Sequence, residues 1–98
     1  MTQAIFHPVA RRELEEAIDY YNAESPGLGS EFREEVQRVL ALLSRFPRLG
    51  QSVRGNVRRM MLSHFPYHIY YRLLESDNLR ILAVAHNHRR PEYWGGRQ

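Results

Sequence analysis

Several residues in the second half of the chain have side chains that could together cleave RNA. Cleavage by the neighbouring 2′-hydroxyl needs a base, an acid and a cation beside the crowded phosphate. Histidine suits the base and acid roles, arginine can hold the phosphate, and tyrosine or tryptophan can stack on a base. The candidate catalytic residues are His68, His88, Arg59, Arg72 and Tyr93, with Trp94 as an alternative stacking residue. No spacing demands this set, and the alternative is that His68 is a half-buried strand residue and the arginines are solvated.

A pair of histidines near the end of a predicted strand raises the question of a metal site. His86 and His88 are two residues apart, so both rings could reach one ion. A useful site needs a third ligand, and the only nearby carboxylate is Glu92. Arg89 and Arg90 would repel a cation. The sequence therefore predicts neither a metal site nor a cofactor.

The segment RRPEYW, residues 89–94, places two aromatic side chains beside arginines, a combination common on binding surfaces. We expect a partner-binding surface that contains Arg58, Arg59, His68, Tyr70, Arg72, Arg89, Arg90, Tyr93 and Trp94. One alternative is that Tyr93 and Trp94 attach the C-terminal segment to the core. Another is that Arg58 and Arg59 only discourage sheet-to-sheet pairing, because strands near an edge often carry charge for that reason.

The first half of the chain must supply the helices that support these residues. The stretch TQAIF predicts a short strand, which His7-Pro8 ends. Apolar residues then recur at helical spacing from Ala10 to Tyr21 and again from Leu28 to Phe46, where Pro47 stops the pattern. Ser25-Pro26 and GLG lie between the two patterns. The sequence therefore predicts two antiparallel helices with a short connection.

The second half changes to the alternation typical of strands. The loop RLGQSVRGN, residues 48–56, precedes predicted strands at Val57–Leu62, Tyr67–Leu74 and Leu79–His86. On the second of these strands, alternation predicts that Tyr67, Ile69, Tyr71 and Leu73 pack on the helices. His68, Tyr70 and Arg72 then lie on the open face. If the third strand keeps its alternation to the end, Leu82, Val84, His86 and His88 share a face.

The predicted fold is α+β, with the order β-α-α-β-β-β: a short N-terminal strand and a two-helix antiparallel hairpin packed on a small antiparallel sheet. A chain of 98 residues is expected to form a single domain, 1–98. It has no cysteine, and its N-terminus lacks the apolar run of a signal peptide or membrane helix, so a cytoplasmic location is expected.

Charge is distributed unevenly along the chain. Residues 1–35 hold three arginines and eight carboxylates, a net charge of −5, while residues 36–98 hold eleven arginines and three carboxylates, a net charge of +8. This asymmetry indicates a basic surface for phosphates or acidic partners. All fourteen cations are arginines, and arginine stays protonated, so no cationic side chain can act as a general base.

Five stretches that together cover most of the chain carry a resemblance to a known family. They are HPVARRELEEAIDYY, LGSEF, FPRLG, VRRMMLSHFPYHIYYRL and ILAVAHNHRRPEYWGGR. The most specific are FPY-x-IYY, residues 65–71, and H-x-x-RRPEYW, residues 86–94. Together they resemble the RelE/ParE superfamily of toxins from bacterial type II toxin-antitoxin pairs, specifically the ParE-like branch. The resemblance implies a partner antitoxin whose C-terminal part folds over the toxin.

The two branches of this superfamily imply different activities. ParE-like members inhibit DNA gyrase, whereas RelE-like members cut messenger RNA in the ribosome. The second-strand arginine of the RelE branch falls on His68, its C-terminal arginine near His88 or Arg89, and its tyrosine on Tyr93 or Trp94. Its early lysines have no counterpart, because this chain has no lysine. We therefore expect a gyrase-inhibiting toxin, with a ribosome-dependent endoribonuclease that uses His68, His88, Arg59 or Arg72, and Tyr93 as the alternative.

Overall fold

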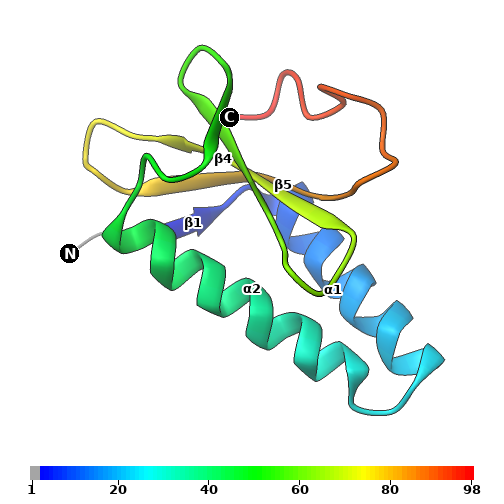
Figure 1. The fold of residues 1–98 in the computed structure, drawn as a ribbon. Coiled ribbons are helices and arrows are strands. Elements are labelled where there is room, and N and C mark those ends of the chain that lie inside the picture. Colours follow the sequence, from blue (N-terminus) through cyan, green and yellow to red (C-terminus); the bar gives the residue numbers. More distant parts are fainter. Residues whose placement is uncertain (1–2) are drawn as a thin grey trace.

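The computed structural model describes residues 3–98 and shows two helices packed on one face of a five-stranded sheet (Figure 1). The elements are β1 (Ala4–Phe6), α1 (Pro8–Glu24), α2 (Leu28–Arg45), β2 (Gln51–Arg54), β3 (Val57–Met61), β4 (Tyr67–Leu73) and β5 (Leu79–His86). The strand order in the sheet is β1-β5-β4-β3-β2. The predicted helical hairpin and the antiparallel meander of the last three strands are confirmed. No helix in this part of the chain is long and apolar enough to cross a membrane.

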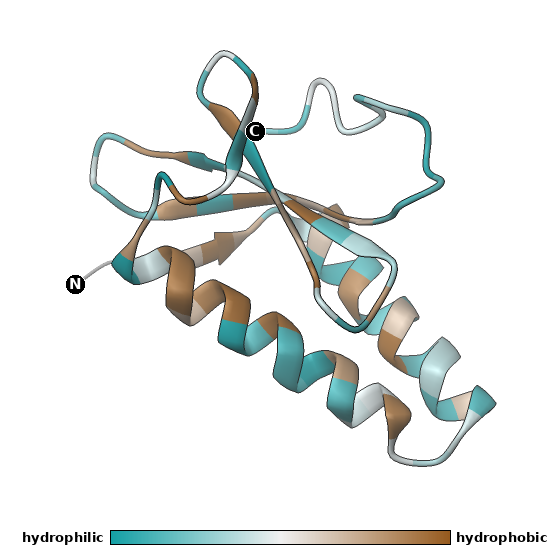
Figure 2. Cartoon of the chain, viewed as in Figure 1, coloured by the Kyte–Doolittle hydropathy of each residue, from teal (hydrophilic) through white to brown (hydrophobic). Residues whose placement is uncertain are grey.

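Local residues define where the two helices begin. Pro8 occupies the first turn of α1, and the Nδ1 atom of His7 caps the helix by accepting a hydrogen bond from Val9 N at 3.1 Å. Gly27, with φ +90°, turns the chain into α2. Along α2, hydrophobic and hydrophilic residues alternate as the helix turns (Figure 2), which buries one side against the sheet.

The sheet has one strand more than the sequence predicted, and it is mixed. β2 forms within the predicted loop 48–56, where it pairs antiparallel with β3 at the edge of the sheet. All four of its residues are exposed, so they carry no alternation that could have indicated a strand. β1 joins the opposite edge in parallel with β5, with Ala4 opposite Leu79. The sheet is therefore not purely antiparallel.

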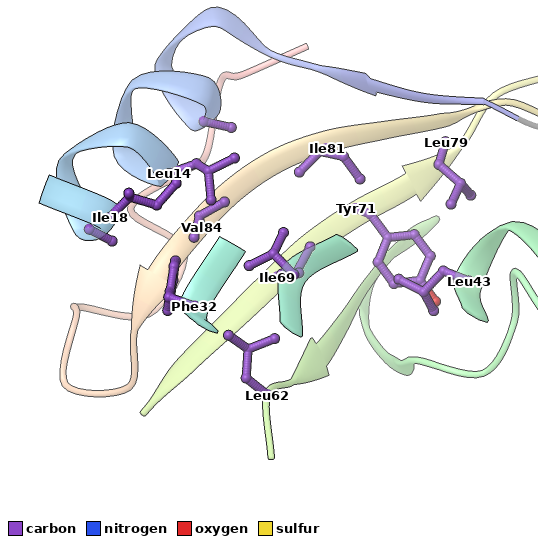
Figure 3. Packing of buried hydrophobic residues seen from close by; sticks show 13 residues of the cluster. Leu14, Ile18, Phe32, Leu43, Leu62, Ile69, Tyr71, Leu79, Ile81 and Val84 are labelled. Atoms are coloured by element: carbon purple, nitrogen blue, oxygen red, sulfur yellow. The ribbon is translucent and has the colours of Figure 1, made fainter. Parts of the chain in front are cut away.

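The main core lies between the helices and the sheet (Figure 3). Its buried residues include Leu14 and Ile18 of α1, Phe32 and Val36 of α2, and Ile69, Tyr71, Leu79, Ile81 and Val84 of the sheet. Tyr67 and Leu73 are partly buried against the same cluster. The predicted helix-facing set on β4 is thus confirmed.

A bulge changes the alternation of β5. Tyr70 pairs with Ala83, but the next residue, Tyr71, pairs with Ile81, so Leu82 is an extra residue on β5. Leu82 lies in the cluster on the open face of the sheet, whereas Val84 packs on the helix side. The prediction that Leu82 and Val84 share a face is wrong, because the bulge shifts the phase of the strand between them.

Candidate functional site

Six of the predicted site residues line one pocket of about 90 Å³ on the open face, where β4 begins and β5 ends. They are Arg59, His68, Tyr70, Arg89, Arg90 and Tyr93, and the remaining lining residues are Ala85, His86, Asn87 and Pro91. Three arginines and two histidines therefore meet here without a lining carboxylate. We call this feature the basic pocket.

His68 is one of the titratable residues that line the basic pocket. It lies on β4 between Met61 of β3 and Ala85 of β5, and Arg59 is two residues from Met61. Partial burial, followed by the nearby guanidinium of Arg59, lowers the pKa of His68, while the Asn87 side chain acts in the opposite direction. The imidazole is therefore favoured in its neutral form at neutral pH.

The other predicted site residues lie outside the basic pocket. Arg72 lies four positions along β4 from His68, opposite Val57 of β3 and Arg80 of β5 in the strand register. Arg58 donates hydrogen bonds to the carbonyls of Arg48 and Gly50, at 3.2 and 2.8 Å, and so holds the loop before β2.

The paired histidines lie where β5 ends: His86 is the last residue of the strand, and His88 is in the turn that follows. His88 is exposed, and its backbone N donates to the Nδ1 atom of His86 at 3.1 Å. The two rings are 5.2 Å apart. Within residues 3–98, no three histidine or carboxylate side chains lie close enough to hold a metal ion.

Tyr93 is part of a hydrogen-bond network that no sequence pattern predicted. Its hydroxyl donates to Glu13 Oε2 at 2.8 Å, and Arg97 donates to both oxygens of the same carboxylate, at 3.0 and 3.2 Å. Glu13 Oε1 also accepts from Val84 N at 3.1 Å, and Arg97 donates to the Leu82 carbonyl. Burial and the hydrogen bond to Glu13 raise the pKa of Tyr93 well above its usual range. We call this network of Glu13, Tyr93 and Arg97 the C-terminal clasp.

Trp94 fills a second, smaller core on the open face of the sheet. It is only 3% exposed, and its ring lies 5.3 Å from that of Tyr70, which is 8% exposed. Val57, Leu82, Ala83 and Ala85 complete this cluster. Arg54 lies over the Trp94 ring and forms an ion pair with Glu92 at 2.9 Å. Figure 1 shows the C-terminal segment on the side of the sheet away from the helices.

A buried carboxylate on α2 holds the β3–β4 turn and was also not anticipated. Glu35 is buried, and it accepts hydrogen bonds from the backbone N of Ser63 and His64 and from His64 Nδ1 at 2.8 Å. Burial alone would raise the pKa of Glu35, but these hydrogen bonds outweigh it and lower the pKa. A Glu on the apolar side of a predicted helix was the only available sign of this contact.

The fold is that of the RelE/ParE toxins. It is similar to the isolated RelE toxin of E. coli, with a TM-score of 0.68, 18% identity, and coverage of 95% of this chain and 92% of that one. It is also similar to a chain of the chromosomal ParDE toxin-antitoxin system from P. aeruginosa, with a TM-score of 0.63, 17% identity, and coverage of 88% and 96%.

Sequence comparison assigns the branch. The profile of the family described as "ParE toxin of type II toxin-antitoxin system, parDE" matches residues 4–91. The chain therefore belongs to the ParE toxin family, as its motifs predicted. No curated protein matches it in sequence.

Proposed function

We propose that this toxin inhibits DNA gyrase and that a cognate antitoxin protein neutralises it. The family match is to ParE toxins, and the resemblance to the ParE-like branch implies gyrase as the target. A similar structure comes from a ParDE toxin-antitoxin system, which supports an antitoxin as the partner.

The contacts of Tyr93 are the observation that favours gyrase inhibition over RNA cleavage. In the alternative function this residue would stack on a base or take part in proton transfer. Its hydroxyl instead donates to Glu13, and the guanidinium groups of Arg89 and Arg97 lie over its ring, 4.4 and 4.9 Å from the ring centroid. Trp94, the other stacking candidate, is buried. Of the two stacking candidates, one is therefore buried and the other is partly buried and already covered by guanidinium groups.

One observation favours the endoribonuclease as the second candidate function. His68 and Arg59 lie at the same pocket, so a base and a phosphate-binding cation are close together. Arg72 and His88 do not line this pocket, so the second histidine of the predicted acid-base pair is not beside His68. Only part of the predicted catalytic set, namely Arg59, His68 and Tyr93, is therefore available at this pocket.

Two parallel assays with the purified protein separate these functions. In the first, gyrase acts on relaxed plasmid; in the second, ribosomes translate a defined message. We expect inhibited supercoiling or trapped cleaved DNA, an intact message, and recovery of gyrase when the antitoxin is added. Codon-phased cuts in the message that disappear in His68→Ala or His88→Ala would refute the gyrase proposal.

A further inference from the structure

The basic pocket is electrostatically incomplete. Arg59 comes from β3, whereas Arg89 and Arg90 follow β5, so two parts of the chain bring cations to one place. None of the residues that line the pocket is a carboxylate. Like charges that meet without a counter-ion repel each other, and an anion from outside the chain would relieve this repulsion.

The Arg59 side chain is already ordered for such a role. Its Nε and Nη2 atoms donate to Gln51 Oε1, each at 3.1 Å. These bonds fix the plane of the guanidinium group and do not use Nη1. Planar guanidinium groups bind carboxylates through paired hydrogen bonds, and a preordered group loses less entropy on binding.

The surroundings of the pocket favour a protein anion over a nucleic-acid strand. Proteins that bind single strands combine cations with exposed aromatic rings on which bases stack. Tyr70 and Trp94 are 8% and 3% exposed, and the guanidinium groups of Arg89 and Arg97 lie over the ring of Tyr93. A volume of about 90 Å³ suits the end of one side chain. The pocket thus offers charge, whereas the tyrosine rings that line it are buried or already covered by guanidinium groups.

We propose that the antitoxin places one of its Asp or Glu carboxylates in the basic pocket. This inference rests on the antitoxin part of the proposed function and is independent of gyrase as the target. The carboxylate would bind Arg59 together with Arg89 or Arg90, and it would supply the negative charge that the pocket lacks. The antitoxin would therefore neutralise this part of the toxin surface by charge as well as by contact.

Affinity measurements on matched variants test the inference. The toxin and the protein encoded in the neighbouring reading frame are purified, and their Kd is measured by calorimetry. Arg59→Gln should raise the Kd about tenfold, and so should at least one of Arg89→Gln and Arg90→Gln, because a charge-assisted hydrogen bond is lost. Arg12→Gln, which removes the same charge from an exposed position on α1 outside the pocket, should change it less than about twofold. Unchanged melting temperatures show that the variants remain folded.

A double-mutant cycle then identifies the carboxylate. Each antitoxin Asp or Glu is changed to its amide and is measured against wild-type toxin and Arg59→Gln. The inference requires one acidic residue whose loss has little further effect in Arg59→Gln. Equal Kd values for all toxin variants, or pocket variants that weaken binding only to a single-stranded oligonucleotide, would overturn it while leaving the antitoxin proposal intact. Failure of wild-type toxin to bind would overturn both.

Discussion

At the scale of single residues, Glu13 connects the helices to the end of the chain. Its carboxylate lies on α1, and it accepts hydrogen bonds from Tyr93, Arg97 and the backbone of Val84. The side chains of Glu13 and Arg97 are only 18% and 15% exposed, so water replaces these bonds poorly. Removing one partner of such an ion pair leaves the other partly buried and unpaired.

We predict that Glu13→Gln destabilises the protein by about 2 to 3 kcal/mol, as measured by urea unfolding. Hydrogen exchange should rise mainly in residues 87–98. The matched control is Glu15→Gln, which breaks the exposed ion pair with Arg33 at 3.3 Å and should cost less than about 1 kcal/mol. Similar losses for both variants would contradict a special role for Glu13.

At the scale of elements, the close approach of α1 and α2 depends on Gly29. Its backbone N donates to Asn22 Oδ1 at 2.8 Å. A Cβ atom at this position would lie 2.6 Å from Asn22 Cγ and would also meet the backbone carbonyl of Ile18. The hairpin therefore needs glycine here because there is no room for a side chain, although Gly29 is helical and has no unusual φ.

We predict that Gly29→Ala destabilises the protein by about 2 to 3 kcal/mol, because the overpacked helices must separate. The better helix propensity of alanine offsets only about 1 kcal/mol of this strain. The melting temperature and the far-UV circular dichroism measure the effect. Ser30→Ala, at the exposed next position, is the control and should be nearly neutral. A stabilised Gly29→Ala protein would show that the helices can separate at no cost.

At the scale of the whole molecule, the sheet has an apolar core on each face. The helices cover one face, and the segment after β5 covers the other through Trp94. The clasp at Glu13 and the ion pair between Arg54 and Glu92 hold this segment from two sides. The C-terminal segment is therefore a structural part of the toxin, and it also shapes the basic pocket.

We predict that Trp94→Ala destabilises the protein by about 3 kcal/mol, because it empties most of the smaller core. Binding of a hydrophobic dye should increase as Tyr70 and Leu82 become exposed. In limited proteolysis, the first cleavage should fall within residues 87–98. Trp94→Phe keeps a ring in the site and should lose roughly half as much stability. Unchanged stability of Trp94→Ala would mean that the second core does not contribute to folding.

Local sequence patterns were sufficient to predict the helical hairpin, the meander and the helix-facing side of β4. Periodicity reports which residues of one element face the core, and capping residues such as His7-Pro8 report where an element begins. The motifs at residues 65–71 and 86–94 pointed to the toxin superfamily through their resemblance to its members. The exposed strand β2 and the bulge at Leu82 escaped prediction, because a strand without alternation or with a shifted phase lacks this signal.

The arrangement of the candidate site residues could be read only from the folded chain. The fold gathered Arg59, His68 and Arg90 around one pocket, left Arg72 and His88 outside it, and buried Trp94. It also paired Glu13 with Arg97, which are 84 residues apart. Contacts between distant parts of a chain leave no periodic trace in one sequence, because they depend on how whole elements are oriented after packing. The positions and contacts of these charged and aromatic residues therefore followed from the fold and not from their spacing.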